Sequence, residues 1–169
     1  HGGCHNTTGM GLFRDQWGRV ADLLEERGLI PFIDIAYQGF AEGLEDDAYG
    51  VRLMYGRVPE MFVTHSCSKN FGIYRDRVGA LSLLSADADT AKVVDSQALS
   101  LVRTIYSLPP DHGAAVVSHI LNDEELRAEW LGELAGMRKR LQAMRKLLVE
   151  ELKSAAPDHD FSHISRTTG

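Results

Sequence analysis

The feature that most constrains this chain is an alternation of short apolar runs with segments of helical periodicity. Residues 29–35, 61–64 and 78–84 are apolar runs that are too short for helices, so each predicts a buried strand. Apolar residues at helical spacing occur within residues 15–27, and a second helix is predicted over residues 46–56. A third helical segment ends before Pro109 and Pro110. This alternation predicts an α/β fold with a mostly parallel sheet, in which ligands bind at the C-terminal ends of the strands.

The longest periodic segment lies near the C-terminus. Apolar residues recur in steps of three and four over most of residues 124–153. A helix of this length often bridges two domains, and Pro157 follows it at a point where a new domain could begin. We therefore expect residues 1–122 to be part of a large domain, residues 123–155 to be a long interdomain helix, and residues 156–169 to begin a truncated small domain.

Composition argues against several classes of partner. The chain has 18 Lys and Arg residues against 24 Asp and Glu, a net charge of -6, so nothing draws it toward nucleic acid or anionic membranes. No apolar run approaches the ~20 residues that a membrane helix needs. Cys4 and Cys67 are too few for a disulfide framework and predict a reduced, cytoplasmic protein. Because a loop-like segment without an initiating Met opens the chain, we expect a piece of a longer protein.

Hydroxyl groups and one amine follow the second predicted strand. Ser66, Ser68 and Lys69 precede Gly72, a residue that permits close approach of a ligand or backbone. A lysine in such a place can attack a carbonyl carbon if burial or nearby cations activate it. A lysine considered alone is more often a solvated surface amine. Ser66 and Lys69 also match the S-x-x-K spacing of serine acyl enzymes, but the companion Ser-Asp-Asn and Lys-Thr-Gly elements do not occur.

Two further side chains lie near the end of the first predicted strand. Asp34 ends this strand and Tyr37 follows in the turn, so both can face one cleft. The same pattern also suits an Asp that caps the turn and a Tyr that only packs. His1, Cys4 and His5 could be considered as metal ligands, but a structural zinc site needs four ligands and no second suitably spaced pair occurs. We predict no metal site.

Four segments, in their order and spacing, resemble class I aminotransferases of the aspartate and aromatic subgroup, which depend on pyridoxal phosphate (PLP). The segments are HNTTG at residues 5–9, DIAYQGF at 34–40, SCSKNFGIYRDRVG at 66–79 and RTIYSLPP at 103–110. The likeness extends from residue 1 to about residue 161. It implies the fold of PLP-dependent transferases of fold type I, a three-layer α/β/α large domain followed by a long interdomain helix.

The resemblance also implies roles for individual residues. Lys69 matches the catalytic lysine that holds PLP as a Schiff base and then moves a proton as general acid and base. Asp34 matches the carboxylate beneath the pyridine nitrogen, and Tyr37 and Asn6 match the two groups that hydrogen-bond the cofactor's phenolic oxygen. The other implied cofactor-binding residues are Ser66, Ser68 and Arg77 at the phosphate, and Ser107 at the phosphate in the neighbouring subunit. Arg103 matches the residue that crosses the same interface to bind a dicarboxylate side chain, so a homodimer with shared active sites is implied.

The activity implied is a ping-pong transfer of an amino group from an aspartate-like or aromatic L-amino acid to 2-oxoglutarate. Lyases and decarboxylases of the same fold stay open as alternatives, as does a non-catalytic dimerising or binding chain. Thr7 and Leu108 depart from the family pattern, which has Pro and Asn there. The family's remaining active-site groups lie upstream of the first motif or beyond residue 169, so we expect little or no transaminase activity from these 169 residues alone.

Overall fold

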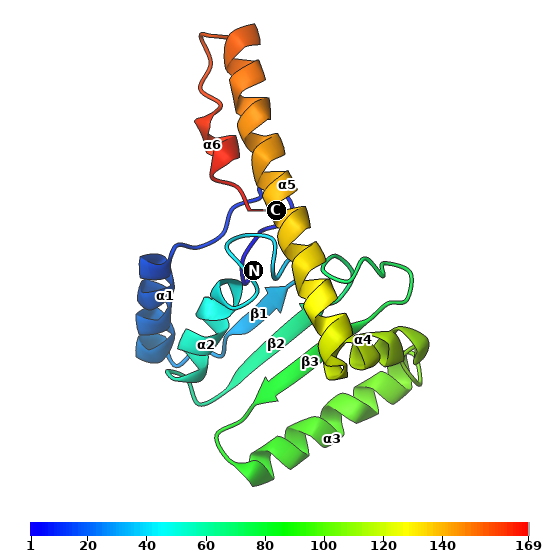
Figure 1. Cartoon of the computed structure of the whole chain (residues 1–169). Coiled ribbons are helices and arrows are strands. Elements are labelled where there is room, and N and C mark those ends of the chain that lie inside the picture. Colours follow the sequence, from blue (N-terminus) through cyan, green and yellow to red (C-terminus); the bar gives the residue numbers. More distant parts are fainter. Residues whose placement is uncertain (169) are drawn as a thin grey trace.

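The computed structural model describes residues 1–168 of the chain. Its first half contains helix α1 (Arg14–Arg27), strand β1 (Phe32–Ile35), the 3₁₀ helix η1 (Asp46–Ala48), helix α2 (Tyr49–Tyr55) and strand β2 (Met61–Ser66). Strand β3 (Gly79–Leu84) follows, and then helices α3 (Ala88–Ile105), α4 (His112–Asn122), α5 (Glu124–Ala155) and α6 (Ser162–Ser165), as Figure 1 shows. The chain is therefore of the predicted α/β class.

The strands of the described residues form one mixed sheet in the order β1-β2-β3. β1 and β2 are parallel, with Asp34 beside Thr64, because the chain crosses over through α2 between them. β2 and β3 are antiparallel, with Ser66 beside Gly79. Residues 67–78 contain no helix that could carry the chain back to the end of the sheet where β2 begins, as a parallel pairing would require. The prediction of a mostly parallel sheet is wrong for these strands, since one of the two pairings is antiparallel.

One face of the sheet packs against α1 and α2. The buried cluster on this face contains Trp17, Ala21, Ile33, Ile35, Met54, Val58, Met61 and Val63. Side chains alternate between the faces of a strand, so Asp34, Thr64 and Ser66 point to the opposite face. Phe32 lies on that opposite face as well and is 69% exposed. The predicted site residues of β1 and β2 therefore lie on the sheet face that α1 and α2 leave uncovered.

Local sequence signals account for the bounds of the first elements. Gly28 adopts the left-handed conformation, with a φ of 59°, and ends α1 where a C-cap glycine was predicted. β1 begins later than the predicted run of residues 29–35, directly after Pro31, which has no N–H to donate to a neighbouring strand. The predicted helix of residues 46–56 is divided into η1 and α2.

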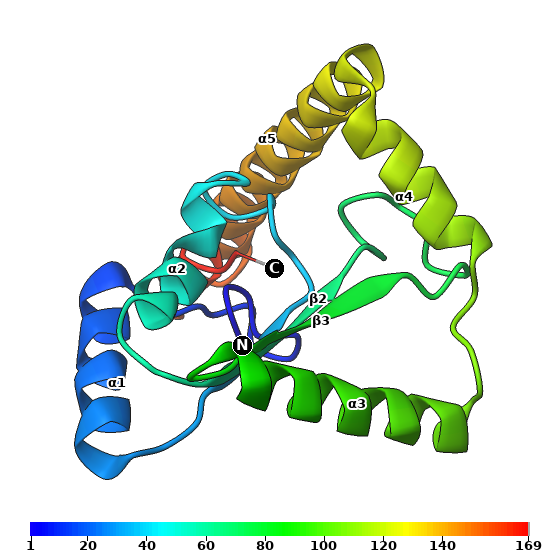
Figure 2. The ribbon, with the colours of Figure 1, turned by 90° about the horizontal axis from the view of Figure 1, so that it is seen from below.

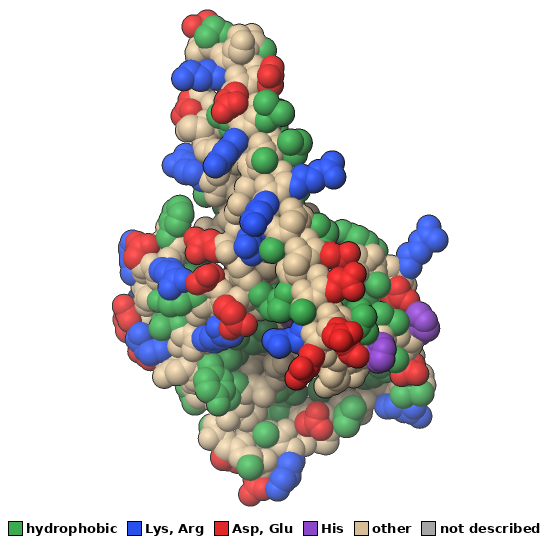
Figure 3. All heavy atoms as spheres, in the orientation of Figure 1, with side chains coloured by type: hydrophobic (Ala, Val, Ile, Leu, Met, Phe, Trp, Pro, Cys, Tyr) green, Lys and Arg blue, Asp and Glu red, His purple; other side chains and the backbone are tan. Residues whose placement is uncertain are grey.

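Helix α5 contains 32 residues and is capped at its N-terminus by Asp123, whose carboxylate accepts hydrogen bonds from the N–H groups of Glu125 and Leu126 at 3.0 Å each. Only Trp130 and Leu134 of this helix are buried. Its C-terminal half extends beyond the sheet, with α6 beside it (Figure 1), and bears acidic, basic and hydrophobic side chains (Figure 3).

Helices α3 and α4 lead from the sheet to α5. In Figure 2, α2 and α3 lie on opposite sides of the sheet. No residue of α3 is buried, and Leu101 and Ile105 are 62% and 73% exposed. Helix α4 was not predicted from the sequence.

Within residues 1–168, no helix is both long enough and apolar enough to cross a membrane.

Candidate active site

Lys69 lies in the turn that follows β2. The Phe71 N–H donates to the Cys67 carbonyl at 3.2 Å, and the Gly72 N–H donates to the Lys69 carbonyl at 3.2 Å. Gly72 has a φ of 68°, a left-handed conformation that glycine adopts without strain. The Lys69 side chain is half-buried, and its Nζ atom lies 4.7 Å from the centroid of the Tyr37 ring. The turn therefore presents the amine to the face of a phenol, where a cation is attracted to the ring.

The N-terminal loop completes the surroundings of Tyr37. Asn6 Nδ2 donates a hydrogen bond to the Tyr37 hydroxyl oxygen at 2.8 Å. Since that oxygen acts as acceptor, the hydroxyl proton of Tyr37 can be donated to another group. The loop is tied to the sheet by the Gly2 N–H, which donates to the Asp34 carbonyl at 2.8 Å. The fold thus brings Asn6, Tyr37 and Lys69 together from three separate segments.

Asp34 projects from the end of β1 on the uncovered face of the sheet. Thr64 Oγ1, from the neighbouring strand, donates to Asp34 Oδ1 at 2.8 Å. Asp34 Oδ2 lies 3.6 Å from His1 Nδ1, and the Asp34 side chain is 50% exposed. Thr64 orients the carboxylate, while its second oxygen stays accessible to a cation or an N–H group.

Antiparallel pairing brings Arg77 back to the end of β2 that carries the serines. The Cys67 N–H donates to the Val78 carbonyl at 3.0 Å, and the Ser68 N–H donates to Ser66 Oγ at 3.2 Å. Arg77 has a positive φ of 54°, and its Nη1 atom donates to the Tyr74 carbonyl at 2.9 Å. The guanidinium is exposed, so it can turn toward an anion at this end of the strands.

Arg103 and Ser107 lie at the end of α3, apart from the other predicted site residues. Arg103 Nη1 lies 3.5 Å from Ser107 Oγ, and both residues are exposed. Within residues 1–168, no hydrogen bond or ion pair joins either side chain to Lys69, Tyr37 or Asp34. The single chain therefore does not bring these two residues into the Lys69 group.

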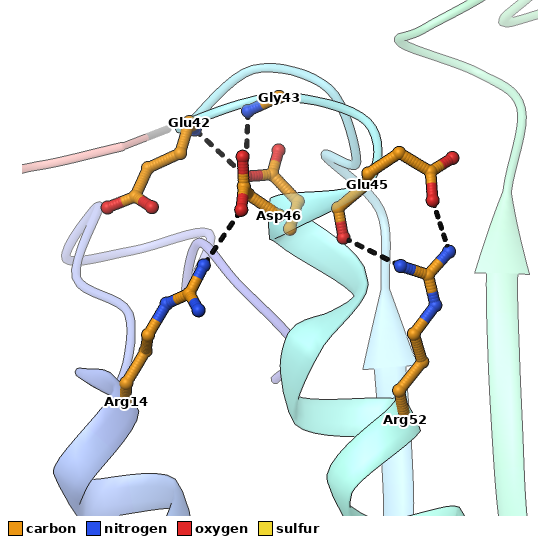
Figure 4. A network of polar contacts seen from close by, with 7 residues as sticks. Arg14, Glu42, Gly43, Glu45, Asp46 and Arg52 are labelled. Carbon is orange, nitrogen blue, oxygen red and sulfur yellow. Dashed lines mark hydrogen bonds and ion pairs between the residues drawn. The ribbon is translucent and has the colours of Figure 1, made fainter.

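The loop after Tyr37 depends on a residue that was not predicted, Asp47. Its carboxylate accepts four backbone hydrogen bonds. The donors are the N–H groups of Gly39 at 2.7 Å, Ala41 at 3.2 Å, Glu42 at 2.9 Å and Gly43 at 3.3 Å. Figure 4 shows Glu42 and Gly43 beside the ion pair of Arg14 with Asp46. Asp47 thus shapes the loop from which Tyr37 emerges. The sequence gives no signal for this role, because Asp47 follows other acidic residues and no pattern distinguishes it from Asp46.

Burial shifts the pKa of three side chains that lie near Lys69 in sequence or interact with its charge. Burial raises the pKa of the Cys4 thiol, while the positive charges of Arg145 and Lys69 act in the opposite direction. Burial also raises the pKa of the Cys67 thiol. For His65 on β2, burial lowers the pKa of the imidazole, which is therefore neutral at pH 7. At pH 7 both thiols and the imidazole are therefore uncharged.

The chain is similar to known proteins over residues 1–169. The family model for aminotransferase class I and II matches residues 1–169. The chain is 48% identical to the aromatic-amino-acid aminotransferase of Pseudomonas aeruginosa and 47% identical to the aspartate aminotransferase of Escherichia coli. Both matches cover 100% of this chain, but only 42% and 43% of the relatives.

A solved structure shows the same likeness in three dimensions. It is an aromatic-amino-acid aminotransferase from Burkholderia pseudomallei covalently bound to pyridoxal phosphate, with a TM-score of 0.96 and 48% identity. The match covers 100% of this chain and 42% of that structure. The chain shares the fold of these neighbours over its whole length, and it belongs to the aminotransferase class I and II family.

Proposed function

We propose that this chain is the lysine-bearing part of a PLP-dependent aminotransferase of the aspartate and aromatic type, with Lys69 as its catalytic lysine. The observation that carries the proposal is the position of Lys69 Nζ 4.7 Å from the Tyr37 ring, whose hydroxyl is held by Asn6. Family membership supports the proposal, because the relatives that this chain matches over its length are named as aminotransferases.

The residues around Lys69 suit the chemical groups of PLP. A primary amine is the group that binds an aldehyde covalently, and Lys69 supplies one. Tyr37 and Asn6 are both donors, as a phenolic oxygen requires. Asp34 offers an anion to a ring nitrogen and would raise the pKa of that nitrogen. For a phosphate dianion, the available groups are Arg77, Ser66 and Ser68.

When bound, PLP supplies an electron sink for the electron pair left at the substrate's α-carbon. Lys69 Nζ would take the proton from that carbon and return a proton in the second part of the reaction, as general base and then general acid. Tyr37, in contact with Nζ, would keep the amine in place during this transfer. The carboxylate of Asp34, which Thr64 orients, would stabilise the positive charge of the protonated ring nitrogen of PLP. We propose that the amino group passes in two half-reactions from an aspartate-like or aromatic L-amino acid to 2-oxoglutarate.

We also propose a homodimer in which a second copy completes each active site. Arg103 would bind the acidic side chain of a substrate in the partner's site, and Ser107 would reach the phosphate there. The separation of both residues from Lys69 within one chain supports this arrangement, and so does the exposure of Leu101 and Ile105 on α3. For the same reason, we expect little or no turnover from the 169 residues alone.

For the domain plan, we propose a three-layer α/β/α large domain within residues 1–122, an interdomain helix at residues 123–155 and the start of a small domain at residues 156–169. The placement of α2 and α3 on opposite sides of the sheet supports the three layers (Figure 2). No residue of α5 beyond Leu134 is buried, which supports packing of this part of the helix against a further domain. The free thiols Cys4 and Cys67 support a cytoplasmic location.

Covalent trapping tests the assignment of Lys69. PLP is added to the natural-length protein that carries this chain, the linkage is reduced with borohydride, and peptide mapping identifies the labelled residue. We expect the label on Lys69, its loss in Lys69→Ala, and its retention in Lys92→Ala, since Lys92 is an exposed lysine paired with Asp89. Label on a different lysine would contradict the proposal.

The reaction products distinguish the alternative activities, because a transaminase releases a 2-oxo acid and needs a second oxo acid, whereas a decarboxylase releases carbon dioxide.

A further inference from the structure

The residue after Lys69 makes contacts that the proposed chemistry does not use. Asn70 is 2% exposed, and its Nδ2 atom donates to the Gln38 carbonyl at 3.4 Å. Its backbone carbonyl accepts a hydrogen bond from the indole N–H of Trp130 at 2.7 Å, from a residue 60 positions away in sequence. Asn70 thus connects the Lys69 turn to the loop that follows Tyr37 and to helix α5.

The indole of Trp130 also packs against the next residue of the turn. The rings of Phe71 and Trp130 are stacked, with centroids 4.4 Å apart and planes inclined by 10°. Trp130 is 8% exposed, so this contact and the hydrogen bond to Asn70 are both shielded from water. One side chain of α5 therefore holds two consecutive residues directly after Lys69.

The same part of α5 holds the loop on the other side of the amine. Leu134, one turn after Trp130, is 2% exposed and clusters with Phe40. A Cβ atom on Gly39 would lie 2.5 Å from Leu134 Cδ2, so the loop approaches the helix as closely as a glycine allows. Tyr37 packs against this cluster as well. The turn that carries Lys69 and the loop that carries Tyr37 thus both pack against the same part of α5.

We propose that Trp130 is a positioning residue for Lys69, an inference that rests on the function proposed above. Its N–H holds the carbonyl of Asn70 and its ring packs on Phe71, so the backbone that carries Lys69 is kept beside Tyr37. Among the described residues, no backbone N–H donates to the Asn70 carbonyl, so loss of the indole donor would leave this buried acceptor without a partner. Proton transfer depends steeply on such placement, because a shift of about 1 Å in a reacting group can cost about a hundredfold in rate.

The variant Trp130→Phe in the PLP-loaded, natural-length protein tests the proposal, because it keeps an aromatic ring for stacking and removes the N–H donor. Trp17→Phe is the matched control, since Trp17 is also 8% exposed but lies in the α1–α2 core. We expect Trp130→Phe to lower kcat by about tenfold with KM changed by less than about twofold. The visible absorbance of PLP bound to the protein is also followed as a function of pH. We expect Trp130→Phe to shift the pH at the midpoint of this absorbance change by about half a unit or more. Trp17→Phe should alter thermal stability only.

Phe71→Leu provides a second variant, because it keeps the N–H donor and removes the stacked ring. It should shift the absorbance midpoint in the same direction by a smaller amount, and it carries the test if Trp130→Phe does not fold. Unshifted midpoints in the folded variants, or equal losses of kcat in Trp130→Phe and Trp17→Phe, would overturn the positioning role while leaving Lys69 as the labelled residue. If borohydride trapping in the unmodified protein labels another lysine, the proposed function itself fails, and the positioning role fails with it.

Discussion

Replacing Asp47 by Asn removes the negative charge that holds the loop after Tyr37. Each carboxylate oxygen of Asp47 accepts two backbone N–H groups: Oδ2 accepts those of Gly39 and Ala41, and Oδ1 accepts those of Glu42 and Gly43. An amide has one oxygen only. Two of the four N–H groups would therefore face an NH₂ group that cannot accept.

The expected loss of stability follows from these contacts. A hydrogen bond to a charged acceptor contributes about 1.5–3 kcal/mol net, and water can replace part of this because the loop is only half-buried. For two lost bonds we expect Asp47→Asn to lower the free energy of unfolding by about 2–3 kcal/mol. Because the loop carries Tyr37, we also expect a fall in kcat.

Asp46→Asn is the matched control, since it makes the same chemical change at the neighbouring residue. Asp46 pairs with Arg14 at 2.7 Å, but the two side chains are 54% and 59% exposed. Such an exposed pair contributes about 0–1 kcal/mol. Urea denaturation followed by tryptophan fluorescence compares the two variants. If Asp47→Asn destabilises the protein no more than Asp46→Asn does, the loop does not depend on the Asp47 carboxylate and the reasoning is refuted.

Two further predictions concern packing and pH. Gly39→Ala should destabilise the protein, because the new Cβ would meet Leu134 at 2.5 Å on a residue whose φ is +97°; Gly132→Ala, on an open side of α5 with no atom within 4 Å, should stabilise the helix by about 0.5–1 kcal/mol. Unfolding free energies of the two alanine variants that differ by less than about 1 kcal/mol would count against this packing. Burial holds the pKa of His65 below its ordinary value of 6.5, so at lower pH the unfolded state binds more protons than the folded state. The stabilising contribution of neutral His65 should therefore be complete above pH 6.5 and decline as the pH falls toward the lower folded-state pKa. His65→Gln should flatten the pH dependence of the unfolding free energy below pH 6.5, and an unchanged slope there would disprove this role of His65.

Local patterns in the sequence predicted most of the elements. The apolar runs that became β2 and β3, and the long periodicity that became α5, are signals that arise within single segments, so no knowledge of distant contacts is needed to detect them. The C-cap at Gly28 is equally local, because it depends on the backbone conformation of one residue. Helix α4 was missed, although it directly precedes α5. The direction of β3 was also missed, because the choice between parallel and antiparallel pairing depends on how the chain crosses the sheet.

The sequence by itself determined which chemical groups are available: an amine at Lys69, a carboxylate at Asp34 and a phenol at Tyr37, in segments that resemble one family. Only the tertiary structure decided which groups meet. Asn6 reaches Tyr37 because the N-terminal loop is tied to β1, and Trp130 reaches the Lys69 turn because α5 packs back over it. Such contacts join residues far apart in the chain, and their geometry depends on the packing of whole elements, which no local pattern encodes.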